Sequence, residues 1–269
     1  MDYQLYLPDE RLAPYVKCYW SLTNEAQNAS RERIFPDGCI ELIFNTGDLM
    51  RKYDSAKEFH IQPRSFIHGQ ITKFLEIEPT GETKIFSARF HPGGLQRFID
   101  FEVGELTDTT RAVAEIWGNE GTLLEQQMTA AATDEDKTAI VSNFLLQRLA
   151  LSKKHDTDAE YCVNKLVAAN GVASTADIAV ELQIGKRQLE RKFIAAVGLP
   201  LKMLARILRF QHTLQLIEKH EFMSFTQVAY DGGFYDQAHF IKDFRQFTGL
   251  NPKKYFSENL EMAKYFVFE

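Results

Sequence analysis

The sequence predicts an α+β protein with a β-rich, barrel- or sandwich-like N-terminal domain, a helical linker and an all-α C-terminal module that holds two helix-turn-helix motifs. Short runs of β-branched and aromatic residues between turn sequences fill the first 103 residues. Apolar residues at three- and four-residue spacing, typical of amphipathic helices, dominate the rest. The 269 residues allow two domains, and 45% hydrophobic with 25% charged residues excludes a disordered or collagen-like chain.

Residues 1–103 form the predicted β-rich sensor or regulatory domain. Turn sequences containing glycine and proline separate the expected strands, which are residues 15–22, 33–45, 74–78 and 84–91. Residues 40–44 are nearly all apolar, which indicates a strand buried on both faces. Four aromatic residues either line a pocket or fill the core, and we favour the core; they are Trp20, Phe35, Phe44 and Phe90.

Residues 104–159 are predicted as a helical linker. Its clearest helix spans Asp134–Leu151, with Thr133 as its cap. An apolar stripe on this helix either supports a homodimer or packs within the chain; it consists of Ile140, Phe144, Leu145 and Leu149. The polar residues 152–159 show no periodicity, and we place the domain boundary there.

Residues 160–258 are predicted as short helices that repeat one layout twice, about 50 residues apart, followed by a tail at 259–269. In the first unit Ser174 caps a short helix, residues 183–185 make a turn, and Gly198 ends the second helix, Lys186–Val197. A long helix at residues 201–219 follows. In the second unit Ser224 opens a short helix, Gly232 and Gly233 make the turn, and Asp236 caps residues 237–247.

A short helix, a tight turn and a second helix form a helix-turn-helix motif, whose second helix enters the DNA major groove. On each second helix one face is apolar and the opposite face is polar. Arginine pairs well with guanine, glutamine with adenine, and glutamate can accept from cytosine. The residues expected to contact DNA are Lys186, Arg187, Glu190, Arg191, Gln237, Ala238, His239, Ile241, Lys242 and Arg245. Arg206 and Arg209 on the long helix either contact phosphates or form a solvated face.

The charge distribution is compatible with this interpretation, although the chain carries a net charge of −6. The first 159 residues carry −8 and the remainder carries +2. Because DNA responds to the local charge of a protein surface, the acidic total does not exclude a DNA-binding C-terminal module.

The C-terminal motifs also resemble those of the AraC-type DNA-binding domain. The likeness rests on Ile178-Ala179, Leu189-x-Arg191-x-Phe193, residues 198–200, Arg206 to Arg209, residues 233–240 with Phe244, and Gly249-x-Asn251-Pro252. This resemblance implies seven helices, two recognition helices at 186–197 and 237–247, and a role in transcription regulation. The sequence departs from the pattern at Glu190, where a polar or cationic residue is usual, and at Tyr230 before the doubled glycine.

Residues 33–45 and 89–94 resemble an uncharacterised β-domain that precedes AraC-type modules, which implies a sensor role. We therefore expect a sequence-specific DNA-binding transcription regulator that uses two recognition helices in successive major grooves and responds to an effector through its N-terminal domain. Double-stranded DNA is the expected partner; a small-molecule effector, RNA polymerase and a second copy of the chain are further candidates. The alternative is a DNA-binding module fused to an enzymatic domain, such as a DNA-repair alkyl transferase, or to a protein-recruiting domain.

We expect no enzymatic activity, no cofactor and no metal site. Cys18, Cys39 and Cys162 are scattered and lack metal-ligand spacing, and we expect them to pack as apolar residues. His60, His68 and His91 lie in separate segments, which favours hydrogen-bonded structural histidines. The sequence has neither an apolar run long enough to span a membrane nor a signal peptide, so we expect a cytoplasmic protein.

Overall fold

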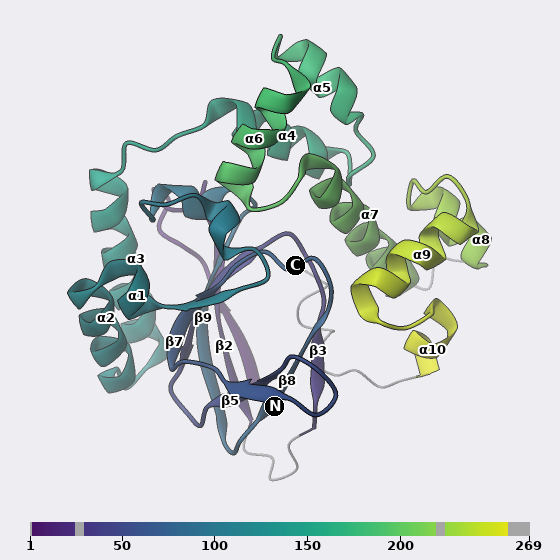
Figure 1. Ribbon diagram of the computed structural model, residues 1–269. Coiled ribbons are helices and arrows are strands. Elements are labelled where there is room, and N and C mark those ends of the chain that lie inside the picture. The colour runs from purple at the N-terminus through teal and green to yellow at the C-terminus, as the bar shows by residue number, and fades with distance from the viewer. Residues whose placement is uncertain (1, 25–29, 219–223, 258–269) are drawn as a thin grey trace.

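The computed structural model describes residues 2–24, 30–218 and 224–257. The predicted tail at 259–269 and the last residue of the helix expected at 201–219 lie outside the described residues. Two sheets form the N-terminal part, three helices cover one of them, and further helices form the C-terminal part (Figure 1). The predicted α+β class is confirmed, with a sandwich-like arrangement of sheets that does not close into a barrel.

Both sheets are antiparallel. Sheet A has the strand order β1-β2-β9-β4-β7-β10, and sheet B has the order β3-β8-β5-β6. The strands are β1 (Asp2–Tyr6), β2 (Val16–Asn24), β3 (Glu32–Ile34), β4 (Ile40–Asn45), β5 (Met50–Tyr53), β6 (Phe59–Ile61), β7 (Ser65–His68), β8 (Leu75–Pro79), β9 (Thr83–Phe90) and β10 (Thr110–Ala112). Strand β10 pairs with β7, so sheet A takes in residues that the sequence placed in the helical linker.

The β-rich segment expected at residues 33–45 is two strands, separated at the turn sequence Pro36-Asp37-Gly38. The structure divides it into β3 in sheet B and β4 in sheet A, joined by a connection at residues 35–39. Pro36 has no N–H to donate to a strand ladder, and Gly38 has a left-handed φ of 82°. The chain therefore turns here and crosses from one sheet to the other.

Sheet A is covered on both faces, as the apolar run at residues 40–44 predicted. Ile40, Leu42 and Phe44 of β4 pack in a core with the linker helices α1 (Val113–Trp117), α2 (Asn119–Ala130) and α3 (Asp134–Leu151). The alternate residues Glu41 and Ile43 face the space between the two sheets.

The apolar stripe of α3 packs within the chain. Leu145 is fully buried in the core under sheet A, and Phe144 packs edge-on against Trp117 with ring centroids 4.8 Å apart. Ile140 and Leu149 pack, partly buried, against the same core. Of the two alternatives for this stripe, the structure shows intramolecular packing, with Leu145 buried and the other three residues partly buried.

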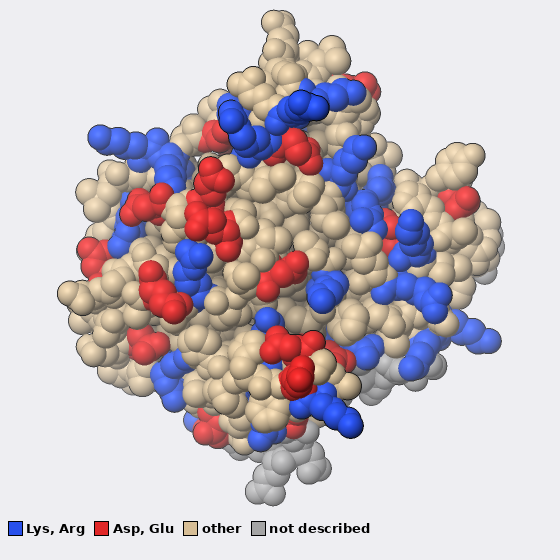
Figure 2. Space-filling model, viewed as in Figure 1, with Lys and Arg blue, Asp and Glu red and all other residues tan. Residues whose placement is uncertain are grey.

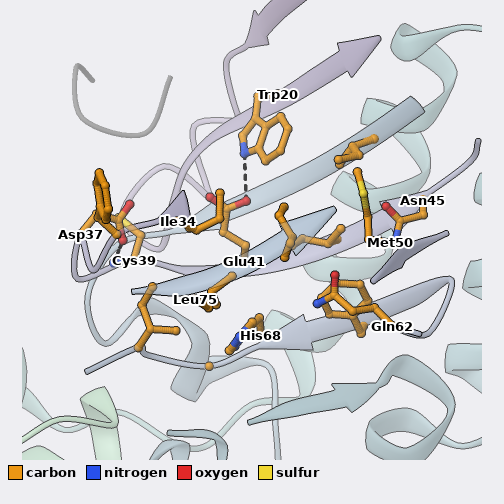
Figure 3. A pocket seen from close by; sticks show the side chains of 17 residues that line it. Trp20, Ile34, Asp37, Cys39, Glu41, Asn45, Met50, Gln62, His68 and Leu75 are labelled. Carbon is orange, nitrogen blue, oxygen red and sulfur yellow. Dashed lines mark hydrogen bonds between the residues drawn. The ribbon is translucent and has the colours of Figure 1, made fainter. Parts of the chain in front are cut away.

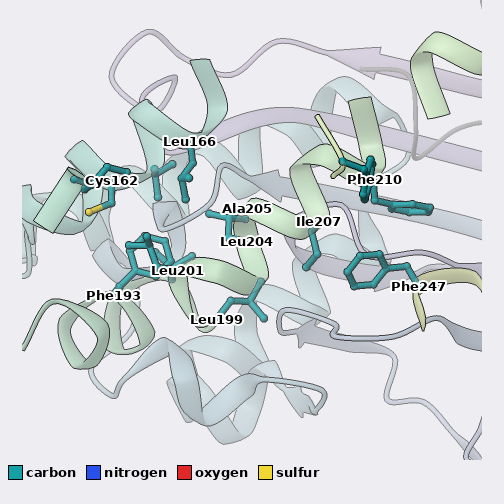
Figure 4. Close-up of a cluster of buried hydrophobic side chains, with 14 of the residues drawn as sticks. Cys162, Leu166, Phe193, Leu199, Leu201, Leu204, Ala205, Ile207, Phe210 and Phe247 are labelled. Atoms are coloured by element: carbon teal, nitrogen blue, oxygen red, sulfur yellow. The ribbon is translucent and has the colours of Figure 1, made fainter. Parts of the chain in front are cut away.

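Seven helices in the described residues form the C-terminal part: α4 (Thr157–Ala168), α5 (Thr175–Glu181), α6 (Lys186–Val197), α7 (Leu201–Glu218), α8 (Phe225–Asp231), α9 (Gln237–Thr248) and α10 (Pro252–Ser257). Asp156 caps α4, so the polar stretch at residues 152–159 contains the first turn of a helix. Phe193, Phe210 and Phe247 lie in one continuous core that links both ends of this part (Figure 4).

The connection between β3 and β4 joins the two parts of the molecule. Phe35 is 2% exposed and lies in the core of the helical part, with its ring centroid 6.4 Å from that of Phe210. The Gln211 side chain donates a buried hydrogen bond of 2.6 Å to the carbonyl oxygen of Pro36. A Cβ on Gly38 would lie 2.9 Å from Leu204 Cδ1. Phe35 is therefore a core residue, as expected, but of the helical part and not of the sheets alone.

Candidate nucleic-acid interface

The first helix-turn-helix unit consists of α5 and α6. Ser174 caps α5 as predicted, because its hydroxyl accepts a hydrogen bond of 3.2 Å from the backbone N–H of Asp177. The turn predicted at residues 183–185 is present, and its left-handed residue is not the glycine. Gln183 adopts the left-handed region with φ 53°, whereas Gly185 is extended and forms the N-cap of α6.

Helix α6 presents a cationic face beside a buried one. Leu189 and Phe193 are buried in the helical core, as expected from their spacing. Arg187 and Arg191 are exposed and have no ion pair within the described residues. Lys186 is also exposed, and Glu190 is half-buried at the edge of this face.

The second unit consists of α8 and α9. Gly233 supplies the turn with φ 74°, and Asp236 caps α9 by accepting a hydrogen bond of 2.7 Å from the backbone N–H of His239. The buried face of α9 contains Phe240, Phe244 and Phe247. On the opposite side three of the predicted residues are exposed and three are half-buried; the exposed ones are Ala238, Lys242 and Arg245, and the half-buried ones are Gln237, His239 and Ile241.

Lysine and arginine side chains gather along the upper and right-hand part of the molecule, over α6, α7 and α9 (Figure 2). Acidic side chains are denser over the N-terminal part in the same view. The two predicted recognition faces therefore lie in the more basic region, in line with the charge asymmetry of the sequence.

Both arginines of α7, named from the sequence as phosphate contacts or a solvated face, are engaged inside the protein. Arg206 forms two hydrogen bonds to the buried Asp243 carboxylate, at 3.0 and 2.7 Å, and a third of 2.6 Å to Gln246. Arg209 is half-buried, donates to the carbonyl oxygen of Gly171, and has its pKa lowered by that burial. These guanidinium groups hold α7 to its neighbours.

Two exposed side chains next to the recognition helices were missed by the sequence analysis. Lys202 lines a groove of about 780 Å³ together with Lys186 and Arg187, between the first unit and the start of α7. Tyr235 lies just before α9 and is 92% exposed. Their positions could have been noticed in the sequence, because each lies within two residues of a predicted helix start in the C-terminal module.

Comparison with known proteins separates the same two parts. Residues 178–258 match a family described as a helix-turn-helix domain, and residues 4–112 match a domain of unknown function, DUF6597. No curated protein matches the sequence. A solved structure of ToxT from Vibrio cholerae is similar, with a TM-score of 0.50 and 13% identity over 88% of this chain and 97% of that one. A second ToxT structure, from Vibrio cholerae O395, gives a TM-score of 0.47 and 14% identity over 88% of this chain and 96% of its own.

At these identities the likeness to ToxT concerns the fold alone. The tandem units, their caps and the family match then decide the nature of the C-terminal part. It is an AraC-type helix-turn-helix domain. The C-terminal domain therefore makes the chain a DNA-binding transcription regulator, as the sequence predicted.

A cavity of about 90 Å³ lies between the two sheets of the domain that precedes the AraC-type domain (Figure 3). Apolar side chains from both sheets make most of its wall, among them Met50, Ile77 and Ile85. Trp20, predicted as a core residue, also lines it. Phe35 and Asp37 contribute from the β3–β4 connection, so the cavity wall continues into the contact with the AraC-type domain.

Buried polar groups stand at one end of this cavity. Arg89 is 2% exposed and forms an ion pair with Asp37. Glu41 accepts hydrogen bonds from Trp20 Nε1 at 3.0 Å and Ser87 Oγ at 2.6 Å. Burial raises the pKa of Glu41, although Arg89 opposes that effect. The cavity thus holds charged groups within an otherwise apolar wall.

The cysteines and histidines do not form a metal centre or an activated nucleophile in the described residues. Burial raises the pKa of Cys39 to about 11 and that of Cys162 to about 11, so both thiols are protonated at neutral pH. No group of three metal-ligating side chains exists within residues 2–24, 30–218 and 224–257. In the same residues, no helix is long and apolar enough to cross a bilayer.

His68 differs from the expectation that the histidines are hydrogen-bonded. Its side chain is buried in the cavity wall beside the backbone of Gly69 and Thr109, and neither ring nitrogen makes a hydrogen bond of normal geometry within the described residues. Burial lowers the pKa of His68 to about 4. His68 is therefore neutral at physiological pH, with one ring nitrogen as a donor and the other as an acceptor.

This burial predicts a pH dependence of stability. Between pH 6.5 and 4 the unfolded chain binds a proton at His68 that the folded chain does not, so acid should destabilise the fold by up to about 3 kcal/mol through this residue. Between pH 7 and pH 4 the free energy of unfolding of a His68→Phe variant should fall by up to about 3 kcal/mol less than that of the unmodified protein. Denaturant unfolding at several pH values measures the difference, and parallel curves for both proteins would contradict the prediction.

Proposed function

We propose that one chain places its two recognition helices, α6 and α9, in successive major-groove segments of one DNA duplex and reads their sequence. The observation that carries this proposal is the pair of exposed polar faces on two capped helix-turn-helix units joined by α7. The 18 residues of α7 span about 27 Å at 1.5 Å per residue. Successive major-groove turns on one side of DNA lie about 34 Å apart, which α7 and its flanking residues can bridge.

The N-terminal domain contacts the recognition helices only near their C-terminal ends within the described residues. Thr107 donates a hydrogen bond to the carbonyl oxygen of Gly198, just after α6. Arg33 donates at 3.5 Å to the carbonyl oxygen of Thr248, the last residue of α9. The exposed faces around Arg187 and Lys242 stay open, so this arrangement of domains is compatible with DNA binding.

Sequence reading by α6 is tested with Arg187→Ala and Arg191→Ala. Each substitution should weaken binding to the cognate site by about 1–3 kcal/mol and binding to random DNA by less, because base contacts are lost. Lys192→Ala is the matched control, since Lys192 is already paired with Asp156 and Asp158. Fluorescence anisotropy with both DNAs measures the effect; equal losses on cognate and random DNA would mean that the arginines contact only phosphate.

Selection of genomic fragments with the purified protein supplies the cognate site and tests the proposal as a whole. We expect the enriched fragments to share two short elements about 10 bp apart, one for each recognition helix. Enrichment without any shared element would contradict sequence-specific recognition. The same experiment indicates which genes the protein controls. RNA polymerase and a second copy of the chain remain predicted partners.

We further propose that the cavity between the sheets is the effector site and that the β3–β4 connection carries the response to the AraC-type domain. Asp37 and Phe35 line the cavity, while the Phe35 ring lies in the helical core and Pro36 accepts the hydrogen bond from Gln211 of α7. A ligand that moves this connection must also disturb the packing of α7. Because α7 joins the two recognition helices, their relative placement would change.

Filling the cavity tests this route without knowledge of the effector. Ile77→Phe adds a ring to the cavity wall, and we expect faster amide hydrogen exchange in α7 together with altered affinity for the selected DNA. Ile61→Phe is the matched control, because Ile61 lies in the same sheet but is exposed. Thermal melting establishes that both variants are folded. A folded Ile77→Phe protein with unchanged exchange in α7 and unchanged DNA affinity would refute the route.

A further inference from the structure

The polar groups of the cavity follow one row across sheet A. In the strand register Arg89 of β9 is the partner of Glu41 of β4, and Glu41 is the partner of His68 of β7. Residues directly opposite each other on antiparallel strands have Cβ atoms about 5 Å apart. Glu41 and His68 both line the cavity, and the Glu41 carboxylate is turned toward Trp20 while the His68 ring lies on the β7 side (Figure 3).

Hydrogen-bond acceptors are left over in this cavity. Glu41 uses its Oε2 atom for Trp20 and Ser87, while its Oε1 atom lies 3.8 Å from Arg89 Nε. His68 is 8% exposed and both of its ring nitrogens lack a hydrogen bond of normal geometry among the described residues. At the other end of the cavity, the side-chain oxygen of Asn45, which is 1% exposed, also lacks one. A ligand can therefore donate N–H or O–H groups to the Asn45 oxygen and to one His68 nitrogen, while the other His68 nitrogen donates.

The charges at the polar end favour a cation. Asp37 and Glu41 face one buried guanidinium, that of Arg89, which leaves one negative charge in excess when both carboxyl groups are ionised. A buried charge is costly unless it is paired and hydrogen-bonded. An ammonium group would balance the excess, whereas a second carboxylate would add to it.

The size of the cavity limits the apolar part of the ligand. About 90 Å³ is less than the roughly 150 Å³ of a cavity that holds benzene, so the ligand body has about three or four carbon atoms. An adjoining surface cleft of about 640 Å³ shares His68, Ile71 and Leu75 with the cavity and provides the entrance. At this entrance Arg31 and Arg33 are both paired with Glu76.

We propose that the cavity between the sheets binds a small aliphatic amine, with its protonated nitrogen at the Glu41 carboxylate and its carbon chain against Met50, Ile77 and Ile85. The binding chemistry follows from the cavity alone, but its meaning as a regulatory signal rests on the proposed effector role of this site.

Three molecules of one shape test the proposal: isobutylamine, isobutanol and isobutyric acid, each titrated calorimetrically into the full chain at pH 7. We expect the amine to bind at least about tenfold more tightly than the alcohol or the acid, because only its ammonium pairs with the carboxylate. Tighter binding of the acid, or no binding of any of the three, would overturn the proposal.

Glu41→Gln should abolish the preference for the amine, while the matched control Glu78→Gln, outside the cavity, should retain it. If Glu41→Gln does not fold, His68→Leu serves instead, and it should weaken amine binding by about tenfold or more. Native-like amine binding by the folded cavity variant would overturn the proposal. Measuring DNA affinity with and without each molecule tests the ligand class and the effector role separately. Amine binding without any change in DNA affinity would support the amine as ligand and contradict the effector role. A change in DNA affinity with the acid alone would support the effector role and contradict the amine as ligand.

Discussion

An Arg206→Ala substitution should lower the free energy of unfolding by about 3–5 kcal/mol, because it leaves the Asp243 carboxylate buried without its partner. Asp243 is 2% exposed on its side chain, and Arg206 supplies two hydrogen bonds to it from α7. Arg245→Ala removes the same charge from the exposed face of α9 and should change stability by less than about 0.5 kcal/mol. Denaturant unfolding of both variants measures the difference.

The result also separates two roles for Arg206. If Arg206 serves only in the ion pair with Asp243, the Arg206→Ala variant should lose stability. Its DNA affinity should then fall only if the loss of the ion pair displaces α9. If Arg206→Ala unfolds at the same denaturant concentration as the native protein but binds DNA more weakly in a salt-dependent way, the phosphate contact first expected from the sequence is correct.

Phe35→Ala should also lower the free energy of unfolding by about 3–5 kcal/mol, because it removes a buried ring from the core of the AraC-type domain. The Phe35 ring packs against Phe210 and Tyr255, so the loss should appear first in the AraC-type domain. We expect hydrogen exchange to accelerate in α7 while the central strands of sheet A stay protected. Phe59→Ala is the control, because Phe59 is about half exposed on β6.

Uniform acceleration across both domains would contradict this account of Phe35, since it would show that the two domains unfold as one unit. No change in α7 would contradict it as well. The measurement thus tests whether the β3–β4 connection couples the cavity to the DNA-binding helices.

The helical half of the fold was the more predictable, because its signals are local. Ser174, Ser224 and Asp236 each cap the helix that the sequence assigned to them, and Gly198 and Gly249 end helices in the left-handed conformation. A cap and the helix it starts lie within four residues, so one short window contains the whole signal. The recognition faces follow from the same 3.6-residue period.

The sheets were harder to predict, because a strand depends on a partner that is distant in sequence. Strand β6 is three exposed residues and β10 lies far along the chain from its partner β7, so neither has a distinct local pattern. The break between β3 and β4 had a visible signal in Pro36 and Gly38, but the run of apolar residues after it masked the change of sheet.

Contacts between residues that are distant in sequence also explain which features of the sites could not be predicted. The partner of Arg206 is Asp243, 37 residues later on another helix, and the helix period shows only that Arg206 is polar. Phe35 was expected in a core, yet nothing near it in sequence indicates that the core belongs to the C-terminal domain. Likewise, the row of Arg89, Glu41 and His68 exists only once three strands are paired.

The central claim is that one chain reads two adjacent major-groove segments, and footprinting on a selected site with the purified protein tests it most directly. We predict an asymmetric protected region of about 20 bp per chain, with two elements about 10 bp apart. An Arg191→Ala variant should lose protection at one element and a Lys242→Ala variant at the other. Protection of a single element per chain, affected by only one of these substitutions, would contradict the claim and leave the second unit with a structural role.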